Sequence, residues 1–413
     1  MATINNSITR LGIMDVADSI IADAVCGANQ AHLILGPPGT AKTSIGQYIA
    51  DSLTRIMGTD YQLVFLDMQT LDPADLAIPM PDPESKTFAY WFNEVFGFTP
   101  DQPVVLLIDE YSKPQNPASQ NAVHQLFSKD KKTGCRRLLS MMLHPDSVII
   151  GTGNLGTDGV GDMVKSHTRN KVTMHYVRNP YPDEWLPWAF ENNINPIVQG
   201  WVKQTPLCFA SYLDPDFGSL PEDIKSMVYN PDPKNPAREQ GCVTARSLEF
   251  ASNVFHAYFN AQAMGLRYTE QMLLADLQGV IGNQAARSML VFKNFAMELP
   301  SAKQIMAGGA AYPTSIAAHI ICSLNACVWI TGAGYGLTAP ETKLEVKNRI
   351  AGWFNYMMGG LAPDAQTMFV HSVKDAAEKA ARKQETTVMS KLWELTVTTH
   401  EFQKWASVNG FKY

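Results

Sequence analysis

The chain has 413 residues, of which 17% are charged, and its 33 basic and 39 acidic side chains give a net charge of −6. This length predicts two or three domains, each large enough for a hydrophobic core. The acidic balance argues against a protein that coats DNA electrostatically, although it leaves room for a local basic patch. The charged fraction is below the roughly 25% of an ordinary soluble chain, which is a weak indication that other subunits cover part of the surface.

The cysteines and the apolar segments favour a cytoplasmic protein with no membrane segment. The six cysteines form no CxxC pair and lie at no zinc-ligand spacing, so reduced thiols are expected. The N-terminal MATINNSITRLG contains no apolar signal core. The most apolar stretch, Ile316–Ile330, is shorter than the about 20 residues of a membrane span and includes His319, so we expect a buried helix there.

Residues 1–180 alternate β-rich runs with helical patterns, which predicts an α/β layer with a largely parallel sheet. Helical patterns such as Ser44–Met57 and Ser119–Phe127 lie between most of the runs. Two prolines then interrupt the regular pattern at Asn179–Pro182. The five candidate strands are His32–Leu35, Leu63–Asp67, Val104–Ile108, Val148–Thr152 and Lys171–Val177.

Residues 183–413 have mostly helical apolar spacing, as in Ala245–Tyr258 and Leu344–Met358. A polar, proline-rich loop is predicted for Asp214–Gln240. The glycine-rich Thr331–Pro340 is interpreted as another loop, in which Thr338 and Glu341 form a capping box for the next helix.

A phosphate-binding loop is predicted directly after the first candidate strand. It consists of Gly36, Pro37, Pro38, Gly39, Thr40, Ala41, Lys42 and Thr43, and a helical pattern follows it. Backbone N–H groups and the positive end of that helix can surround the β- and γ-phosphates of ATP, Lys42 can contact them, and Thr43 can ligate Mg²⁺. Ala41 stands where the common pattern has glycine, so either it has a negative φ or the loop is strained.

Polar side chains follow two further strands. Asp109 and Glu110 end the apolar run that starts at Val104. Asp109 can hold Mg²⁺ through water, and Glu110 can activate the water that attacks the γ-phosphate. Asn154 follows the next run, where its amide can hydrogen-bond that water or the γ-phosphate as a nucleotide sensor.

In combination these motifs resemble the AAA+ ATPases. GPPGTAK, the stretch Asp109-Glu-Tyr-Ser-Lys-Pro with Ser119–Ala122, and an insert at Leu71–Leu76 and Phe88–Trp91 narrow the resemblance to the MoxR-like, helix-2-insert group. The resemblance covers about residues 10–260. It implies an AAA+ α/β core over 1–182 with inserted hairpins at about 71–92 and 129–146, a helical lid over 183–300, and a C-terminal helical extension over 301–413.

The resemblance also implies a homo-oligomeric ring, usually a hexamer, with ATP bound between subunits. Arg169 is the best match for the arginine that reaches the ATP of the neighbouring subunit, although Thr168 replaces the usual acidic residue, so Lys165 or Lys171 are alternatives. Arg246, at the start of a lid helix, matches the arginine that couples the γ-phosphate to the lid.

Three functions follow from these features. The first is a remodelling chaperone, commonly paired in this group with a partner that contains a von Willebrand factor type A (VWA) domain. The second is a nucleic-acid motor of the McrB type. The five cations between Lys129 and Arg137 could bind nucleic-acid phosphates or an acidic protein, or form a solvated turn, and no aromatic side chains are interleaved with them. The third is an ATP-binding scaffold with little turnover, against which the presence of Glu110 and Asn154 argues.

Tyr90, Trp91 and Phe92 of the insert are candidates for gripping a polypeptide, or for packing the insert itself.

Overall fold

The computed structural model describes residues 8–413 without several short segments, and structural statements below refer to this described part. The segments outside it are residues 85–86, 94–95, 98–99, 156–165, 233–234, 236–239, 297–298, 301–303, 306–307, 332–339, 383 and 385.

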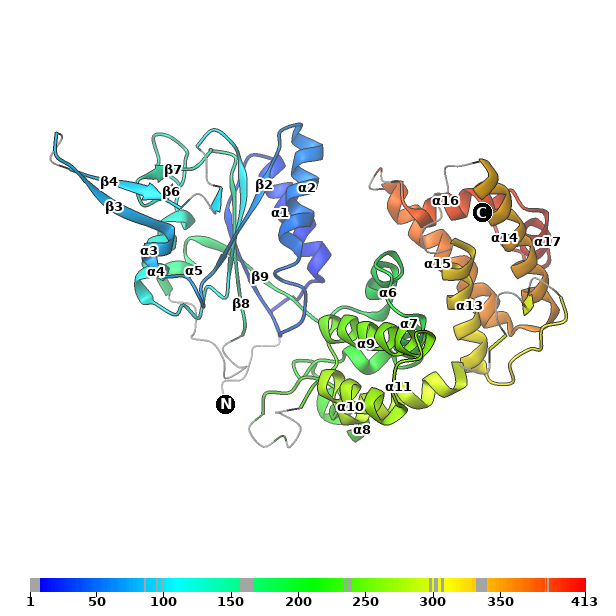
Figure 1. Cartoon of the computed structure of the whole chain (residues 1–413). Coiled ribbons are helices and arrows are strands. Elements are labelled where there is room, and N and C mark those ends of the chain that lie inside the picture. Colours follow the sequence, from blue (N-terminus) through cyan, green and yellow to red (C-terminus); the bar gives the residue numbers. More distant parts are fainter. Residues whose placement is uncertain are drawn as a thin grey trace.

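The N-terminal part is built on a five-stranded, all-parallel sheet with the strand order β2-β5-β8-β1-β9. This confirms the predicted α/β class with a parallel sheet (Figure 1). Each strand lies within two residues of its predicted range. The strands are β1 (Ala31–Leu35), β2 (Gln62–Asp67), β5 (Val104–Asp109), β8 (Val148–Gly153) and β9 (Val172–Tyr176).

Helices cover both faces of this sheet, which explains why its central strands are continuously apolar. On one face α1 (Ile13–Val25) and α2 (Ile45–Met57) pack against Ile34, Leu107 and Ile150. On the other face α4 (Pro117–His124) and the 3-10 turn η2 (Gln125–Phe127) pack against the alternate residues of the same strands, among them Leu33, Leu106 and Ile149. Figure 1 shows the two helical layers on either side of the sheet.

Two hairpins project from this core. After the short α3 (Pro73–Leu76), β3 (Ala77–Asp82) and β4 (Thr87–Phe92) pair antiparallel and extend away from the sheet (Figure 1). The second hairpin contains β6 (Arg137–Leu138) and β7 (Met141–Met142) and is extended by a bridge between Lys129 and Arg136. One-turn α5 (Ser166–Arg169) precedes β9.

A helical part begins at Pro182, the second proline of the predicted break at 179–182. Its core contains fully buried side chains such as Trp201, Phe255 and Leu277. The predicted loop at 214–240 is partly helical, because η5 (Phe217–Ser219) and α8 (Glu222–Lys225) lie within it. Such single turns are too short to produce a detectable apolar period. The main helices are α6 (Pro182–Glu191), α7 (Pro196–Gln204), α9 (Ala245–Ala263), α10 (Glu270–Ile281) and α11 (Asn283–Ala296), with η4 (Pro206–Phe209) between α7 and η5.

The C-terminal helices enclose a second helical core, which contains Trp353, Phe354, Phe402 and Trp405. The predicted buried helix is confirmed as α13, whose Ile321 and Ile330 are fully buried. Thr338 of the predicted capping box lies outside the described residues. No helix among those described combines the length and apolarity needed to cross a membrane. The helices are α13 (Ile316–Thr331), α14 (Pro340–Gly360), α15 (Pro363–Arg382), α16 (Val388–Val397) and α17 (His400–Val408).

Candidate active site

The predicted phosphate loop connects β1 to α2 at the carboxyl edge of the sheet. Lys42 is buried and folds back on the loop: its Nζ donates to the carbonyl oxygens of Gly36 at 3.0 Å and Pro37 at 2.7 Å. The Thr40 hydroxyl also donates to Pro37 O, at 2.9 Å. The ammonium group is thus held among loop carbonyls at the place where the resemblance puts the phosphates.

The structure shows which of the two alternatives for Ala41, a negative φ or a strained loop, occurs. Its φ is +61°, in the left-handed region, so the loop carries backbone strain at this residue. Gly39, two residues earlier, has a φ of +76°, which glycine adopts without cost.

Thr43 and Asp109, the two predicted Mg²⁺ ligands, lie face to face. The Thr43 hydroxyl is 3.1 Å from both carboxylate oxygens of Asp109. A hydroxyl beside a carboxylate provides the hard oxygen ligands that Mg²⁺ prefers, so these residues fit the expected metal. A third residue, Thr152 of β8, donates a short hydrogen bond from its buried hydroxyl to Asp109 Oδ1. The same hydroxyl oxygen accepts the Glu110 N–H at 3.3 Å.

Glu110, Asn154 and Lys42 form a connected set. Asn154 Nδ2 donates to Glu110 Oε1 at 3.0 Å, and Lys42 Nζ donates to Asn154 Oδ1 at 3.2 Å. The other Glu110 oxygen, Oε2, is buried and has no hydrogen-bond partner among the described residues. A buried carboxylate oxygen without a donor fits the water molecule that the expected reaction requires.

Two properties of Glu110 are typical of a functional residue. Its φ of +50° is unusual for a residue other than glycine. Burial, followed by the nearby Asp109 carboxylate, raises the pKa of Glu110 above its ordinary value, and Lys42, Lys113 and Asn154 oppose this rise. A raised pKa makes the carboxylate a stronger base for a water proton.

The start of α9 touches the phosphate loop. Thr244, which caps α9, lies so close to Gly39 that a Cβ atom added to that glycine would be 2.5 Å from Thr244 Cβ. Arg246 follows in the first turn of α9, with an exposed side chain. The structure therefore places Arg246 on the helix that contacts the loop, and its coupling of the nucleotide to the lid stays a prediction.

The candidate trans arginine lies at the end of α5. Arg169 has an exposed side chain, whereas Thr168 before it is buried. Of the two alternatives, Lys171 is exposed next to β9, and Lys165 lies outside the described residues. A side chain that acts on another subunit must be exposed, and both Arg169 and Lys171 meet this condition.

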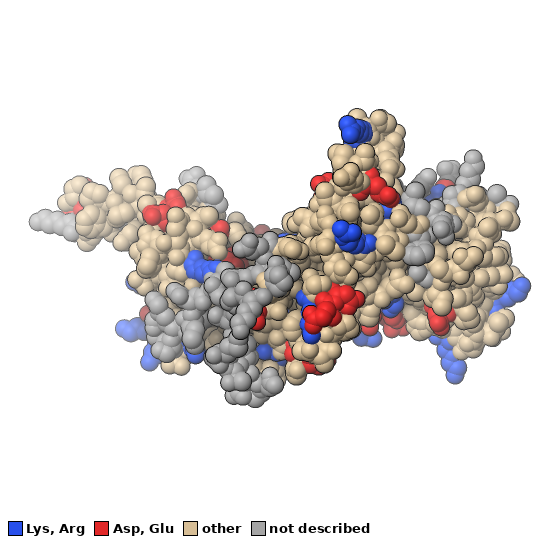
Figure 2. Space-filling view, turned by 90° about the horizontal axis from the view of Figure 1, so that it is seen from below, with Lys and Arg blue, Asp and Glu red and all other residues tan. Residues whose placement is uncertain are grey.

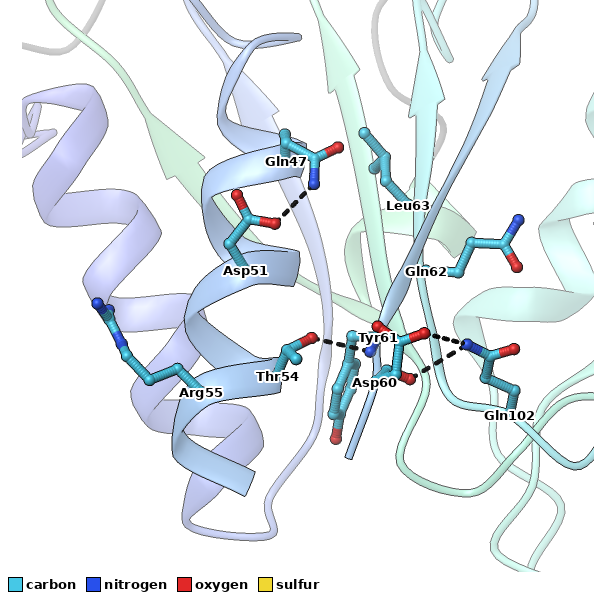
Figure 3. Close-up of a pocket in the computed structure, with 9 residues that line it drawn as sticks. All are labelled: Gln47, Asp51, Thr54, Arg55, Asp60, Tyr61, Gln62, Leu63 and Gln102. Carbon is cyan, nitrogen blue, oxygen red and sulfur yellow. Dashed lines mark hydrogen bonds between the residues drawn. The ribbon is translucent and has the colours of Figure 1, made fainter. Parts of the chain in front are cut away.

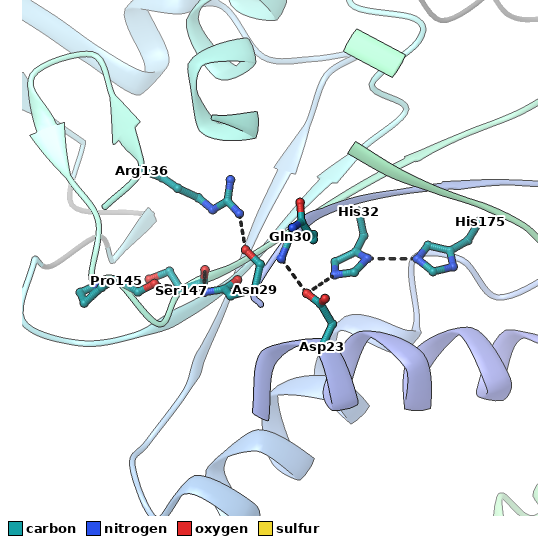
Figure 4. Close-up of polar contacts among 8 residues, drawn as sticks. All are labelled: Asp23, Asn29, Gln30, His32, Arg136, Pro145, Ser147 and His175. Atoms are coloured by element: carbon teal, nitrogen blue, oxygen red, sulfur yellow. Dashed lines mark hydrogen bonds and ion pairs between the residues drawn. The ribbon is translucent and has the colours of Figure 1, made fainter. Parts of the chain in front are cut away.

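The basic hairpin needs a correction. Arg136, one of its five cations, is 3% exposed; its guanidinium donates to Leu126 O at 2.8 Å and to Asn29 O at 2.7 Å. Arg136 therefore braces the hairpin against the core instead of offering a charge to a phosphate (Figure 4). Arg136 is buried and the next residue, Arg137, is exposed, because successive side chains of a strand point to opposite faces.

Two other surface features are the distribution of charge and the exposed side chains of the inserted hairpin. The face in Figure 2 carries scattered acidic and basic side chains and no continuous basic surface among its described residues. On the inserted hairpin Phe88 is 70% and Trp91 68% exposed, and Ile78, which pairs with Trp91, is 56% exposed. Within the described residues, the aromatic side chains at positions 88 and 91 are thus largely available to a partner.

A separate pocket lies away from these groups. It has a volume of about 710 Å³ and is lined mostly by polar residues of the C-terminal half of α2 and the start of β2, such as Asp51, Arg55 and Gln62 (Figure 3). Strand β2 has its start at the edge of the sheet opposite to the carboxyl edge that bears Asp109. This pocket is therefore no part of the candidate active site.

The sequence analysis did not predict Thr152 and Thr244 as parts of the site. Thr152 ends the predicted strand Val148–Thr152, but only the register, in which Ile108 pairs with Gly151, brings it beside Asp109. Thr244 likewise depends on how separate elements meet, and no local pattern in the sequence marks it.

No protein-family model matches the chain, and no curated protein is significantly similar to it. Among solved structures the chain is similar to a candidate ATPase from Cytophaga hutchinsonii, with 12% sequence identity, a TM-score of 0.30 and coverage of 66% of this chain and 82% of that one. A TM-score this low carries no argument about the activity of the chain.

Proposed function

We propose that the chain is an AAA+ ATPase that hydrolyses ATP with Mg²⁺ in an oligomeric ring and remodels a protein partner. One observation carries the ATPase part of this proposal. At the carboxyl edge of a parallel sheet, hydrogen bonds join Asn154 to Lys42 and Glu110, and Thr43 to Asp109. The Thr152 hydroxyl links the two sets, because it donates to Asp109 and accepts the N–H of Glu110. Ligands of open α/β sheets bind at this edge.

The residues of the chain divide the work as follows. Lys42 and the N–H groups of the loop hold the terminal phosphates, and Thr43 and Asp109 hold Mg²⁺. The bound metal neutralises charge that develops on the phosphates. Glu110 accepts a proton from the attacking water, and Asn154, now bonded to both Lys42 and Glu110, orients that water or the γ-phosphate.

Two variants separate binding from turnover. Lys42→Ala removes a charge-assisted contact and should weaken ATP binding by about 10- to 100-fold, measured by titration with a fluorescent ATP analogue. Glu110→Gln should keep ATP binding and lower kcat by about 10²- to 10⁴-fold, measured by phosphate release. Lys132→Ala, which removes an exposed lysine of the second hairpin, is the matched control for lost charge. Unchanged ATP binding in Lys42→Ala would contradict the assignment.

The ring is proposed from the family resemblance and from the exposure of Arg169. If Arg169 acts on the neighbouring subunit, Arg169→Ala subunits retain an intact ATP site but cannot serve the next one. Mixing them with Glu110→Gln subunits, which retain the arginine, should restore part of the ATPase activity that each lacks alone. Normal hydrolysis by Arg169→Ala alone would show that the arginine is misassigned. Loss of specific activity on dilution would support assembly.

The exposed aromatic side chains of the inserted hairpin favour a protein client, and a partner with a VWA domain is the form that the resemblance implies. Glu110→Gln should accumulate in the ATP-bound state and retain the client in a pull-down. Stimulation of the ATPase by DNA would instead favour a motor of the McrB type. Absence of turnover in assembled rings would favour an ATP-binding scaffold.

A further inference from the structure

A buried contact joins the acidic strand end to the helix of the candidate trans arginine. Tyr111, the residue after Glu110, is 3% exposed, and its hydroxyl lies 3.4 Å from the Thr168 hydroxyl. Thr168 is 1% exposed and directly precedes Arg169, whose side chain is exposed. The backbone therefore passes from a buried anchor to an exposed cation within one residue.

Tyr111 is held firmly at the end of β5. Its N–H donates to Thr152 O at 2.9 Å, and its carbonyl oxygen accepts from Gln120 Nε2 at 2.9 Å. Its ring meets Phe127 edge to face with 4.9 Å between the ring centroids. The Tyr111 side chain is thus fixed in position next to Asp109 and Glu110.

Thr168, in contrast, lies in a helix that is too short to hold its orientation without tertiary contacts. Helix α5 has only four residues, Ser166–Arg169, and a single turn is not stable without tertiary contacts. The Lys171 N–H donates to Thr168 O at 2.9 Å and closes the turn into β9. The direction of Arg169 therefore depends on how the Thr168 side chain is anchored.

We propose that the Tyr111–Thr168 pair positions Arg169 toward the γ-phosphate of ATP bound by the neighbouring subunit, and links this orientation to Asp109 and Glu110 of its own subunit. The two hydroxyls support a specific role, because Phe and Val of similar shape would fill the same space without the cost of burying polar groups. This inference rests on the proposed ring in which Arg169 acts in trans.

Mixed rings test the pair without touching the site in which hydrolysis occurs. Arg169→Ala subunits supply intact ATP sites, and Lys42→Ala subunits, which bind ATP poorly, supply the arginine. Introducing Tyr111→Phe or Thr168→Val into the Lys42→Ala subunit should lower the restored kcat by about two- to tenfold, the value of one hydrogen bond. KM for ATP should stay unchanged, because ATP is bound by the other subunit.

Three further mixtures make the result specific. Combining Tyr111→Phe with Thr168→Val should cost no more than either change alone, because both remove the same contact. Thr168→Ser, which retains the hydroxyl, should restore kcat to nearly the level of the Lys42→Ala subunit. Ring assembly and melting temperature of every subunit are measured beside kcat.

The outcomes separate the inference from the proposed function. If Lys42→Ala subunits fail to activate Arg169→Ala subunits, the trans arginine and this inference both fall. If they activate them, and Tyr111→Phe and Thr168→Val subunits assemble and activate equally well, only the positioning role is overturned.

Discussion

At the scale of single residues, the site depends on hydroxyl groups that hold its carboxylates. Thr152 contacts Asp109 and accepts the N–H of Glu110, so one side chain of β8 fixes the last residue of β5 and the residue after it. Such supporting contacts orient a metal ligand without contacting the metal. Tyr111 extends the same end of β5 to a different element, α5.

Thr152→Val should therefore impair turnover although Thr152 contacts no substrate in the proposed mechanism. It preserves the shape of the side chain and removes the hydroxyl, which should lower kcat, or raise the Mg²⁺ concentration for half-maximal activity, by about 10- to 100-fold. Steady-state ATPase assays over a range of Mg²⁺ concentrations measure both quantities. Thr152→Ser should be close to the unchanged protein, and equal losses in the two variants would refute the hydroxyl's role.

The two left-handed residues of the phosphate loop should respond in opposite ways to substitution. Ala41→Gly relieves about 1–2 kcal/mol of strain and loses about 0.4–1 kcal/mol through a more flexible unfolded chain, so a small gain in the free energy of unfolding is expected. Gly39→Ala should destabilise, because it adds strain at a φ of +76° and a Cβ atom 2.5 Å from Thr244 Cβ. Urea unfolding compares the two variants, and a destabilised Ala41→Gly would contradict the strain.

At the scale of elements, polar contacts fasten the second hairpin and α1 to the sheet. Asn29 Nδ2 donates to Pro145 O at 3.0 Å and Ser147 O at 3.2 Å, while Arg136 donates to Asn29 O (Figure 4). Nearby, His32 of β1 lies between His175 of β9 and Asp23 of α1, at 3.0 and 3.3 Å. Both groups are built from residues far apart in the sequence.

Arg136→Ala should destabilise the chain by about 2 kcal/mol, because the buried carbonyl groups of Leu126 and Asn29 lose their donor. The adjacent Arg137→Ala removes the same charge from an exposed position and should change the free energy of unfolding by less than about 0.5 kcal/mol. Chemical denaturation measures both. Similar effects of the two variants would argue against the brace.

Protonation of His32 should make the free energy of unfolding depend on pH. Burial, aided by repulsion from His175, lowers its pKa from 6.5 to about 4, against the opposing effect of Asp23. The folded chain thus disfavours protonation, so stability is complete above pH 6.5 and falls as the pH drops toward 4, by about 3 kcal/mol. Denaturation at pH 7 and pH 5 should show a smaller difference in His32→Asn than in the unchanged protein. Equal pH dependence would contradict this.

At the scale of the whole molecule, α13 connects the two helical cores. Ile321 packs in the core of α7, α9 and α11, and the next residue, Cys322, packs with Ala326 in the C-terminal core. Ile321 also lies against Gly200 of α7, where an added Cβ atom would be 3.2 Å from its Cγ1. The predicted division at residue 300 stays a prediction, but the two parts share this helix.

Ile321→Ala should consequently destabilise the lid as well as its attachment to the C-terminal helices. A cavity at a fully buried isoleucine costs about 2–5 kcal/mol. Ile316→Ala, on the same helix but 68% exposed, should cost less than about 0.5 kcal/mol. Thermal unfolding gives the stability, and limited proteolysis reports whether the C-terminal helices separate. Equal melting temperatures of the two variants would show that the connection is unimportant.

The α/β class and the five strands could be predicted from the sequence, which also predicts Lys42, Thr43, Asp109, Glu110 and Asn154 as site residues. These predictions follow from local patterns, because apolar runs, glycine-rich turns and acidic strand ends lie within a few consecutive residues. The left-handed conformation of Ala41, the burial of Arg136 and the contacts of Thr152, Tyr111 and Thr244 are visible only in the tertiary structure. Those properties arise where separate elements pack against one another, and a residue's burial and partners there are set by long-range contacts that no local pattern encodes.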